Sequence, residues 1–582
     1  MSPWASQTLL RGTLTAGVLL AVSPAHGQAL PGSLPSRQQV EAPRVPDSPP
    51  PSSLTVRDDR PRPARCAFAG STLSVAIDRL RFTAADGGPL PDPVRAALAQ
   101  IRPTPGLQPL DQLCALRDAA ASALGRRGYV AGVTIPPQEI VDGEARLSVV
   151  LARLTEIRIT GDPGPHGRTL TRRAQRLIGL PVLDTAEIES VLMGANDVPG
   201  LQATLVLAAA GTVPGEVIGE LTVTHMPWLV VANAQNSGAR ALGRESATIR
   251  AEIYGLTGHA DRTYLGLSST FDLREQRVVQ IGHSMATDGG ATLGARFSYA
   301  WSRPDLGGLD LRARSMIAGL DLSVPLARGV RGRSEIGGGV ELVEQQLQLG
   351  GGDVGGSVPV SRDRLRVAYL RMGFDRREPR FSGIDRWSLS GSFELRQGLD
   401  LFGATQGGVV SGDGYAPSRF DASATATVAR GSIDATFSAG PVFSLSVQAQ
   451  GQWASGPLFS FEEYAVGNLT IGRGYDPGIA AGDGALAFRI EPRADLPWGS
   501  PAVVQAFAFL DAAQLWNRDE LSDESGNRLR SLGLGIRGWL PGRLAVEAIY
   551  ARPLDPELRF PGARRAGDRL LLSLTAQFAP RR

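Results

Sequence analysis

The second half of the chain alternates apolar and polar residues in segments of about ten. Between Phe443 and Trp453 every second residue is apolar or glycine, and the residues between them are serine or glutamine. The same alternation recurs at 293–301, 387–395 and 570–578. Because successive side chains of a β-strand point to opposite faces, this period of two indicates strands with one apolar face and one polar face. Such segments, separated by turns rich in glycine, aspartate and proline, are typical of a transmembrane β-barrel whose polar face lines a lumen.

Residues 226–582 have room for about 16 strands at roughly 22 residues per strand and connection. We therefore predict an antiparallel barrel of about 16 strands over this range. A soluble sandwich or propeller with one buried face would also alternate, but it would not explain the export signal at the start of the chain.

Two smaller modules precede the predicted barrel. Residues 64–152 and 153–225 each show a strand, two helices and two strands, in the same order. The helical segments include Leu110–Leu124 in the first module and Thr185–Met193 in the second. An internal repeat of this size indicates tandem domains, each with a small core of its own. The predicted fold is therefore mixed, with two α+β domains followed by a β-barrel.

The N-terminal part of the chain is predicted to be an export signal followed by a linker. Arg11 precedes an apolar stretch from Leu14 to Val22, and small residues precede Gln28, so residues 1–27 read as a signal peptide. Residues 28–63 are rich in proline and poor in apolar side chains, which predicts an extended linker. A segment threading through a pore would have the same composition, and the sequence does not decide whether this segment forms a plug helix.

Composition excludes several kinds of chemistry. All 60 basic residues are arginine, so lysine-dependent phosphate loops and Schiff bases are ruled out. A formal net charge of +3 is too small to indicate a nucleic-acid partner. The five histidines are never spaced like metal ligands. The adjacent Glu462 and Glu463 are expected to lie in a solvated loop, since neighbouring side chains point apart. We expect no enzyme activity, no catalytic residues, no metal and no cofactor.

The two cysteines of the chain both lie in the first predicted module. Exported proteins meet oxidising conditions, so Cys66 and Cys114 are predicted to form a disulfide.

Three stretches resemble one protein family. GYVAGVTIPPQEIVDGEARLSVV (128–150) resembles the end of the first polypeptide-transport-associated (POTRA) domain of two-partner secretion transporters, which export haemolysins and filamentous haemagglutinins across Gram-negative outer membranes. IGRGYDPGIAAGDGALAFRIEPR (471–493) is similar to their sixth extracellular loop, although Gly472 stands where the family usually has an apolar residue. FAFLDAAQLW (507–516) looks like their Phe-x-Asp strand motif.

The resemblance implies a lock between a loop and the barrel wall. Arg473, Gly474 and Tyr475 match the Arg-Gly-Tyr core of the loop, which would fold back into the barrel so that Arg473 meets Asp511. Alternation along its strand independently places Asp511 on the lumen face. A client-binding region is assigned to the first module at Gly128, Tyr129 and Val130.

The resemblance also implies a function. The chain would be a monomeric outer-membrane transporter with its modules in the periplasm, and the bilayer and a secreted exoprotein with an N-terminal secretion domain would be its partners. The client would pass through the lumen and fold outside as a β-helix, without nucleotide hydrolysis. The alternative is a factor of the same superfamily that inserts outer-membrane proteins into the bilayer. A passive porin is the third possibility, and the tandem modules argue against it.

Overall fold

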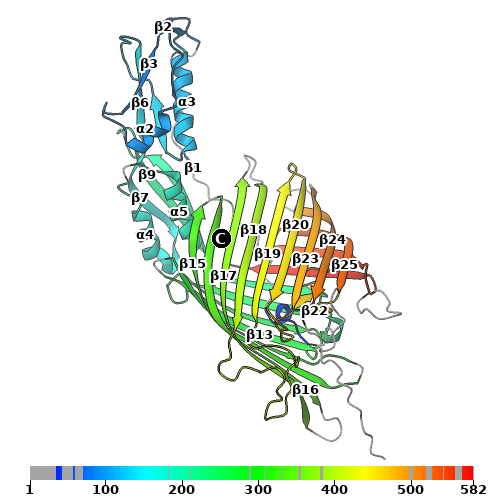
Figure 1. Ribbon diagram of the computed structural model, residues 1–582. Helices are drawn as coiled ribbons and strands as arrows, with labels where there is room; N and C mark the ends of the chain where they lie inside the picture. Colours follow the sequence, from blue (N-terminus) through cyan, green and yellow to red (C-terminus); the bar gives the residue numbers. More distant parts are fainter. Residues whose placement is uncertain are drawn as a thin grey trace, which may run out of the picture.

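The computed structural model describes residues 34–41, 57–58, 68, 70–180, 182–211, 213–287, 290–306, 308–329, 331–350, 356–379, 385–496, 503–518, 527–541, 543–556 and 566–580. Two small modules stand in line above one end of a large closed barrel, with the first module farthest from it (Figure 1). The predicted signal peptide, residues 1–27, lies outside the described residues.

The first module packs two helices against a small sheet. Its elements are β2 (Ser74–Ala76), β3 (Arg79–Ala84), α2 (Asp92–Leu98), β4 (Leu107–Pro109), α3 (Gln112–Arg126), β5 (Ala131–Thr134) and β6 (Glu144–Leu151). Strand β6 lies between β3, which runs parallel to it, and β5, which runs antiparallel. The apolar stripe of α3, including Leu113 and Leu124, is buried against Leu147 and Val149 of β6. This burial supplies the module's own core.

Cys114, in α3, is disulfide-bonded. Cys66, the other cysteine in the sequence, lies outside the described residues, so its pairing with Cys114 stays a prediction. Mass spectrometry of unreduced protein should find a peptide that links the two cysteines and no alkylated thiol. The Cys114→Ser variant should lose up to about 4 kcal/mol of unfolding free energy in this module, because the closed loop no longer restricts the unfolded chain. Two alkylatable thiols in native protein would contradict the pairing.

The second module repeats the order of the first. It contains β7 (Arg153–Asp162), η1 (Gly164–His166), α4 (Gly167–Gln175), α5 (Thr185–Asn196), β8 (Leu201–Ala209) and β9 (Glu216–His225). Strand β9 lies between β7 and β8, and a two-residue strand β1 (Arg57–Asp58) pairs in parallel with the outer edge of β8. Part of the segment predicted to be a linker therefore extends the sheet of this module.

A buried histidine lies where the second module meets the barrel. His166 is fully buried, and neither ring nitrogen has a hydrogen-bond partner among the described residues. A Cβ added at Gly255, in the first turn of the barrel, would lie 2.9 Å from its Nε2. Burial lowers the pKa of His166 below its usual range, and the nearby His225 lowers it further. The neutral imidazole is thus the form that fits the junction.

This histidine should make the junction weaker in acid. As pH falls below about 6.5, the unfolded chain gains a proton that folded His166 resists, so folding stability falls with pH. We expect the melting temperature of the purified chain to drop more between about pH 7.5 and about pH 5.5 than that of a His166→Leu variant. Equal drops for the two proteins would show that His166 does not contribute.

Sixteen antiparallel strands close into one barrel, which confirms the predicted fold class and strand number. They are β10 (Trp228–Gln235), β11 (Ser246–Tyr254), β12 (Asp261–Thr270), β13 (Gln276–Ala286), β14 (Thr292–Ser302), β15 (Leu311–Gly329), β16 (Gly332–Gly350), β17 (Ser357–Pro379), β18 (Asp385–Gly398), β19 (Thr427–Ser438), β20 (Phe443–Ala454), β23 (Gly484–Leu496), β24 (Val503–Trp516), β25 (Arg528–Leu540), β26 (Leu544–Pro553) and β27 (Arg569–Phe578). Pairing of β10 with β27 closes the ring.

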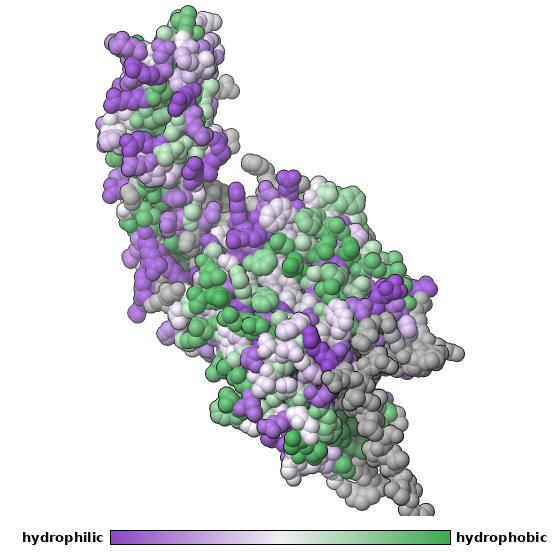
Figure 2. All heavy atoms as spheres, viewed as in Figure 1, coloured by the Kyte–Doolittle hydropathy of each residue, from purple (hydrophilic) through white to green (hydrophobic). Residues whose placement is uncertain are grey.

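The outer wall of the barrel is apolar. Leu570, Leu572 and Leu574 of β27 are exposed on this wall, as the alternation predicts. Hydrophobic side chains gather on the wall in the space-filling view (Figure 2). Within the described residues, no helix combines the length and the apolar content needed to cross a membrane.

Contacts with the second module fix the orientation of the barrel. Arg328, at the end of β15, forms a 3.1 Å ion pair with Asp197, which follows α5. The strand ends at this side therefore belong to the same compartment as the modules. A long loop at the opposite side of the barrel, residues 455–483, contains two short antiparallel strands, β21 (Tyr464–Val466) and β22 (Ala480–Gly482). The loop after β10 contains the 3-10 helix η2 (Arg240–Leu242).

Candidate functional site in the barrel lumen

Charged side chains from several strands point into the lumen. On β18, Glu394 and Arg396 are 7% and 2% exposed, whereas their neighbours Phe393 and Leu395 face outward. Glu341 of β16 is 1% exposed. Alternation along each strand places these charges inside, where they meet one another rather than lipid.

A short helix from the N-terminal segment lies inside the barrel. This helix, α1 (Arg37–Val40), is held by the lumen wall, since Gln345 donates to the carbonyl of Pro35 at 3.1 Å and Gln280 donates to that of Val40 at 2.8 Å. Four residues are too few to form a stable helix alone, so these tertiary contacts must hold it. The sequence left open whether this segment forms a plug helix, and the structure places residues 34–41 in the lumen.

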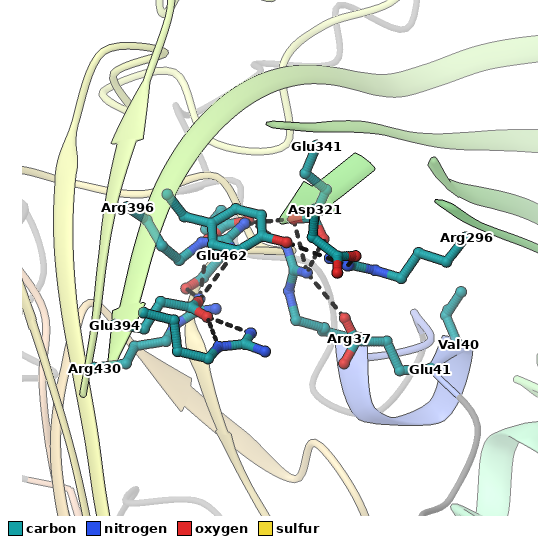
Figure 3. A network of polar contacts seen from close by, with 12 residues as sticks. Arg37, Val40, Glu41, Arg296, Asp321, Glu341, Glu394, Arg396, Arg430 and Glu462 are labelled. Carbon is teal, nitrogen blue, oxygen red and sulfur yellow. Dashed lines mark hydrogen bonds and ion pairs between the residues drawn. The ribbon is translucent and has the colours of Figure 1, made fainter. Parts of the chain in front are cut away.

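Arg37 joins the helix to a network of ion pairs (Figure 3). Its guanidinium lies 3.0 Å from a carboxylate oxygen of Glu341 and also pairs with Glu462, which belongs to the long loop. Arg396 contacts both of these carboxylates, and Arg430 of β19 contacts Glu462 at 2.9 Å. Helix, loop and wall are therefore tied together through shared charges.

The expectation that Glu462 and Glu463 lie in a solvated loop is wrong. Glu462 is 6% exposed, and the side chain of Glu463 pairs with Arg419 at 2.8 Å and is 7% exposed. The loop folds back into the barrel, where arginines of the wall and of a second loop compensate both carboxylates.

An apolar layer lies beside this network. Val40 of α1 and Phe459 and Phe461 of the long loop are 0%, 1% and 2% exposed. They pack against a set of apolar residues that point into the lumen or come from the loop after β18: Val278, Ala300, Ile317, Val343, Leu365, Val367 and Ala422. The lumen face of β13–β17 is therefore not wholly polar as predicted, because here it contacts protein instead of water.

The predicted lock at Asp511 exists in a different form. Asp511 is fully buried on the lumen face of β24, and its Oδ2 accepts hydrogen bonds from the backbone N–H groups of Gly472 and Arg473 at 3.0 and 2.8 Å. The guanidinium of Arg489 binds both carboxylate oxygens at 2.7 and 2.9 Å. The loop thus reaches Asp511 through its backbone, and Arg489 supplies the two-pronged side-chain contact.

The predicted pairing of the Arg473 side chain with Asp511 is corrected accordingly. That guanidinium lies 2.5 Å from Glu491 and stacks over Phe509, with 4.7 Å to the ring centroid. Strand register explains why Arg489, and not Arg473, pairs with Asp511: Arg489 of β23 is its direct cross-strand partner.

The rest of the Arg-Gly-Tyr sequence fits tightly into the wall. A Cβ added at Gly474 would lie 2.6 Å from the Cβ of Ser531, so only glycine allows this approach. Tyr475 is fully buried and donates its hydroxyl to the carbonyl of Arg530 at 2.8 Å. Gly472, where the sequence departs from the family pattern, has φ of +132°, a value that suits glycine.

The residues assigned to client binding lie at the junction of the two modules. The N–H of Val130 donates to Leu183 at 3.1 Å, and the carbonyl of Gly128 accepts from Thr185 at 2.8 Å. Tyr129 forms a bridge with Asp184. Because these backbone groups are already paired within the chain, an extended client would have to displace them, and the role of this segment in client binding stays a prediction.

Sequence reasoning missed Arg37, Glu341 and Arg396, and it placed Glu462 in solvent rather than in this network. No motif marks them. The alternation of β16 and β18 does place Glu341 and Arg396 on the lumen face, and this was the one available signal. Among the described residues no three metal-ligating side chains come together.

Comparisons with known proteins agree with this geometry. A family model described as haemolysin secretion/activation protein ShlB/FhaC/HecB matches residues 355–538. The heme/hemopexin transporter protein HuxB of Haemophilus influenzae (strain 86-028NP) is 24% identical over 443 residues, which are 73% of this chain and 74% of the relative. The outer membrane transporter CdiB-2 of Burkholderia pseudomallei (strain 1026b) is 23% identical and covers 90% of each chain.

Solved structures share the fold. CdiB from Escherichia coli superposes with a TM-score of 0.66 at 18% identity, covering 88% of this chain and 92% of that one. BamA from Haemophilus ducreyi lacking POTRA domains 1-3 superposes with a TM-score of 0.51 at 13% identity, covering 87% and 100%. The relatives are transporters rather than enzymes. The chain is therefore similar to the two-partner secretion transporters of the haemolysin secretion/activation family, and it is an outer-membrane protein with its POTRA modules in the periplasm.

Proposed function

We propose that this protein exports a large exoprotein, which carries an N-terminal secretion domain and folds as a β-helix outside the cell, through its own barrel. One observation carries the proposal: α1 and the loop 455–483 lie inside the lumen, and neither belongs to the strand ladder of the barrel. A pore filled in this way can open for an unfolded chain and close again without leaking solutes. No nucleotide is hydrolysed, and folding of the client outside gives the transport its direction.

The client would first bind the modules, as an added strand. The sheet of the second module ends at β7, whose outer edge pairs with no other strand among the described residues. The outer backbone groups of such an edge strand are of the kind that an extended segment pairs with. Photo-crosslinking groups at the exposed Glu156 and Arg158 of β7 should capture the client in cells, while a group at Arg102 in the first module should not.

Deleting the gene tests the function directly. We expect one large protein to disappear from the culture supernatant and to return with the wild-type gene. The abundance of other outer-membrane proteins should stay unchanged. Their general depletion would instead support an insertion factor, the alternative role, and an unchanged supernatant would exclude export.

A further inference from the structure

An aromatic ladder runs along the outer face of β14. Phe297, Tyr299 and Trp301 are neighbours on this face, with ring centroids 6.4 Å apart for the first pair and 4.5 Å apart for the second. Trp301 is 43% exposed, whereas Ala300 beside it points inward and is fully buried. Aromatic side chains gather at the two membrane–water interfaces of a β-barrel, and Trp301 marks one of them.

This interface is the extracellular one. The opposite ends of the strands approach the second module, where Arg328 of β15 pairs with Asp197. Residues Ser302 and Leu311, at the other ends of β14 and β15, therefore lie on the outer-leaflet side of the membrane.

Two arginines flank Trp301 in the same cross-strand row. Arg277 of β13 and Arg314 of β15 are its direct partners on either side. Both are exposed, and their inward-pointing neighbours Val278 and Ser315 are 4% and 0% exposed, so both arginines point outward. Adjacent strands lie about 4.8 Å apart, which puts both guanidinium groups within reach of one head group.

Neither arginine has an ion-pair partner among the described residues, although neighbouring arginines do. Arg312 pairs with Asp310 at 2.6 Å. Glu344, an outward-facing carboxylate on β16, is contacted by Arg364 and Arg366 at 3.5 and 3.4 Å. Carboxylates close to the row are thus engaged elsewhere, and Arg277 and Arg314 stay available to an external anion.

We propose that Arg277, Trp301 and Arg314 bind the phosphorylated head group of an outer-leaflet glycolipid. Guanidinium groups bind phosphate through parallel hydrogen bonds, and the ladder below supplies an apolar surface for the acyl chains. The occupant must be anionic at one end and apolar at the other, because the two cations and the ladder form one continuous surface. A soluble anion would leave the ladder uncovered.

The test uses the full-length protein in detergent and diphosphoryl lipid A as the probe. Native mass spectrometry should show the wild type binding this lipid roughly 10- to 30-fold more tightly than the same lipid without phosphates. The double variant Arg277→Gln/Arg314→Gln should bind both lipids equally weakly, and Arg277→Lys/Arg314→Lys should keep part of the preference. The matched control Arg102→Gln removes an exposed arginine of the first module and should bind like the wild type.

Folding of each variant is checked by the gel mobility of the unheated barrel. The comparison of the two lipids on the wild type needs no variant, so it tests the preference for phosphate even if a variant fails to fold. Equal binding of the two lipids by the wild type, or an unchanged preference in the Gln double variant, would overturn the proposal. Displacement of the lipid by millimolar inorganic phosphate would overturn the assignment to a lipid and show a soluble-anion site.

Discussion

Replacing Asp511 by alanine is expected to abolish secretion while a folded barrel still reaches the outer membrane. The change removes the acceptor of two backbone N–H groups of the loop and of both prongs of Arg489. Losing one partner of a buried ion pair costs about 3–5 kcal/mol, because the other charge stays unpaired. The loop should leave the wall, whereas the strand ladder of the barrel keeps its hydrogen bonds. Exoprotein in the supernatant and the gel mobility of the unheated protein measure the two effects.

A wall carboxylate on the neighbouring strand provides the matched control. Asp495 of β23 accepts a 2.6 Å hydrogen bond from Gln505 and does not touch the loop. Asp495→Ala should therefore secrete at nearly the wild-type level. A comparable loss in this variant would mean that negative charge in the lumen matters, and not the lock.

A double-mutant cycle separates the two arginines. Asp511→Ala combined with Arg489→Ala should be little worse than either single change, since the pair acts as a unit. Asp511→Ala combined with Arg473→Ala should show weaker coupling, because the Arg473 side chain binds Glu491. Full additivity for Asp511 and Arg489 would refute the observed pairing.

Reversing the charge of Arg37 should open the pore. In Arg37→Glu a third carboxylate would face Glu341 and Glu462, whose positive partner in α1 is lost. Breaking a buried network of this kind costs several kcal/mol, enough to raise the open fraction roughly a hundredfold. Planar-bilayer recordings should change from mostly closed to mostly open.

Glu41→Gln is the control for this experiment. The side chain of Glu41 is 46% exposed, and its ion pair with Arg37 at 3.1 Å lies at the edge of the network. Exposed pairs contribute about 0–1 kcal/mol, so this variant should stay closed. A pore that stays closed in Arg37→Glu would show that the apolar layer alone holds the helix.

The barrel could be predicted from sequence because lipid imposes a strict constraint. Each strand must turn apolar side chains toward lipid, so every strand segment shows apolar residues at alternate positions. The same alternation correctly predicted that Asp511 faces the lumen. Helix α1 could not be predicted, since four residues among prolines carry no periodic signal and are stabilised by distant parts of the chain. The choice between Arg473 and Arg489 depended on strand register, which local sequence does not reveal.

Because of the apolar layer around Val40, the free energy of opening the pore should depend on temperature. Withdrawing α1 and the long loop would bring water to Phe459, Phe461 and the apolar wall that now covers them. Hydration of newly exposed apolar surface raises the heat capacity, so the free energy of opening must curve with temperature. The seal is then tightest at an intermediate temperature and weakens on both heating and cooling, as the stability of a folded domain does.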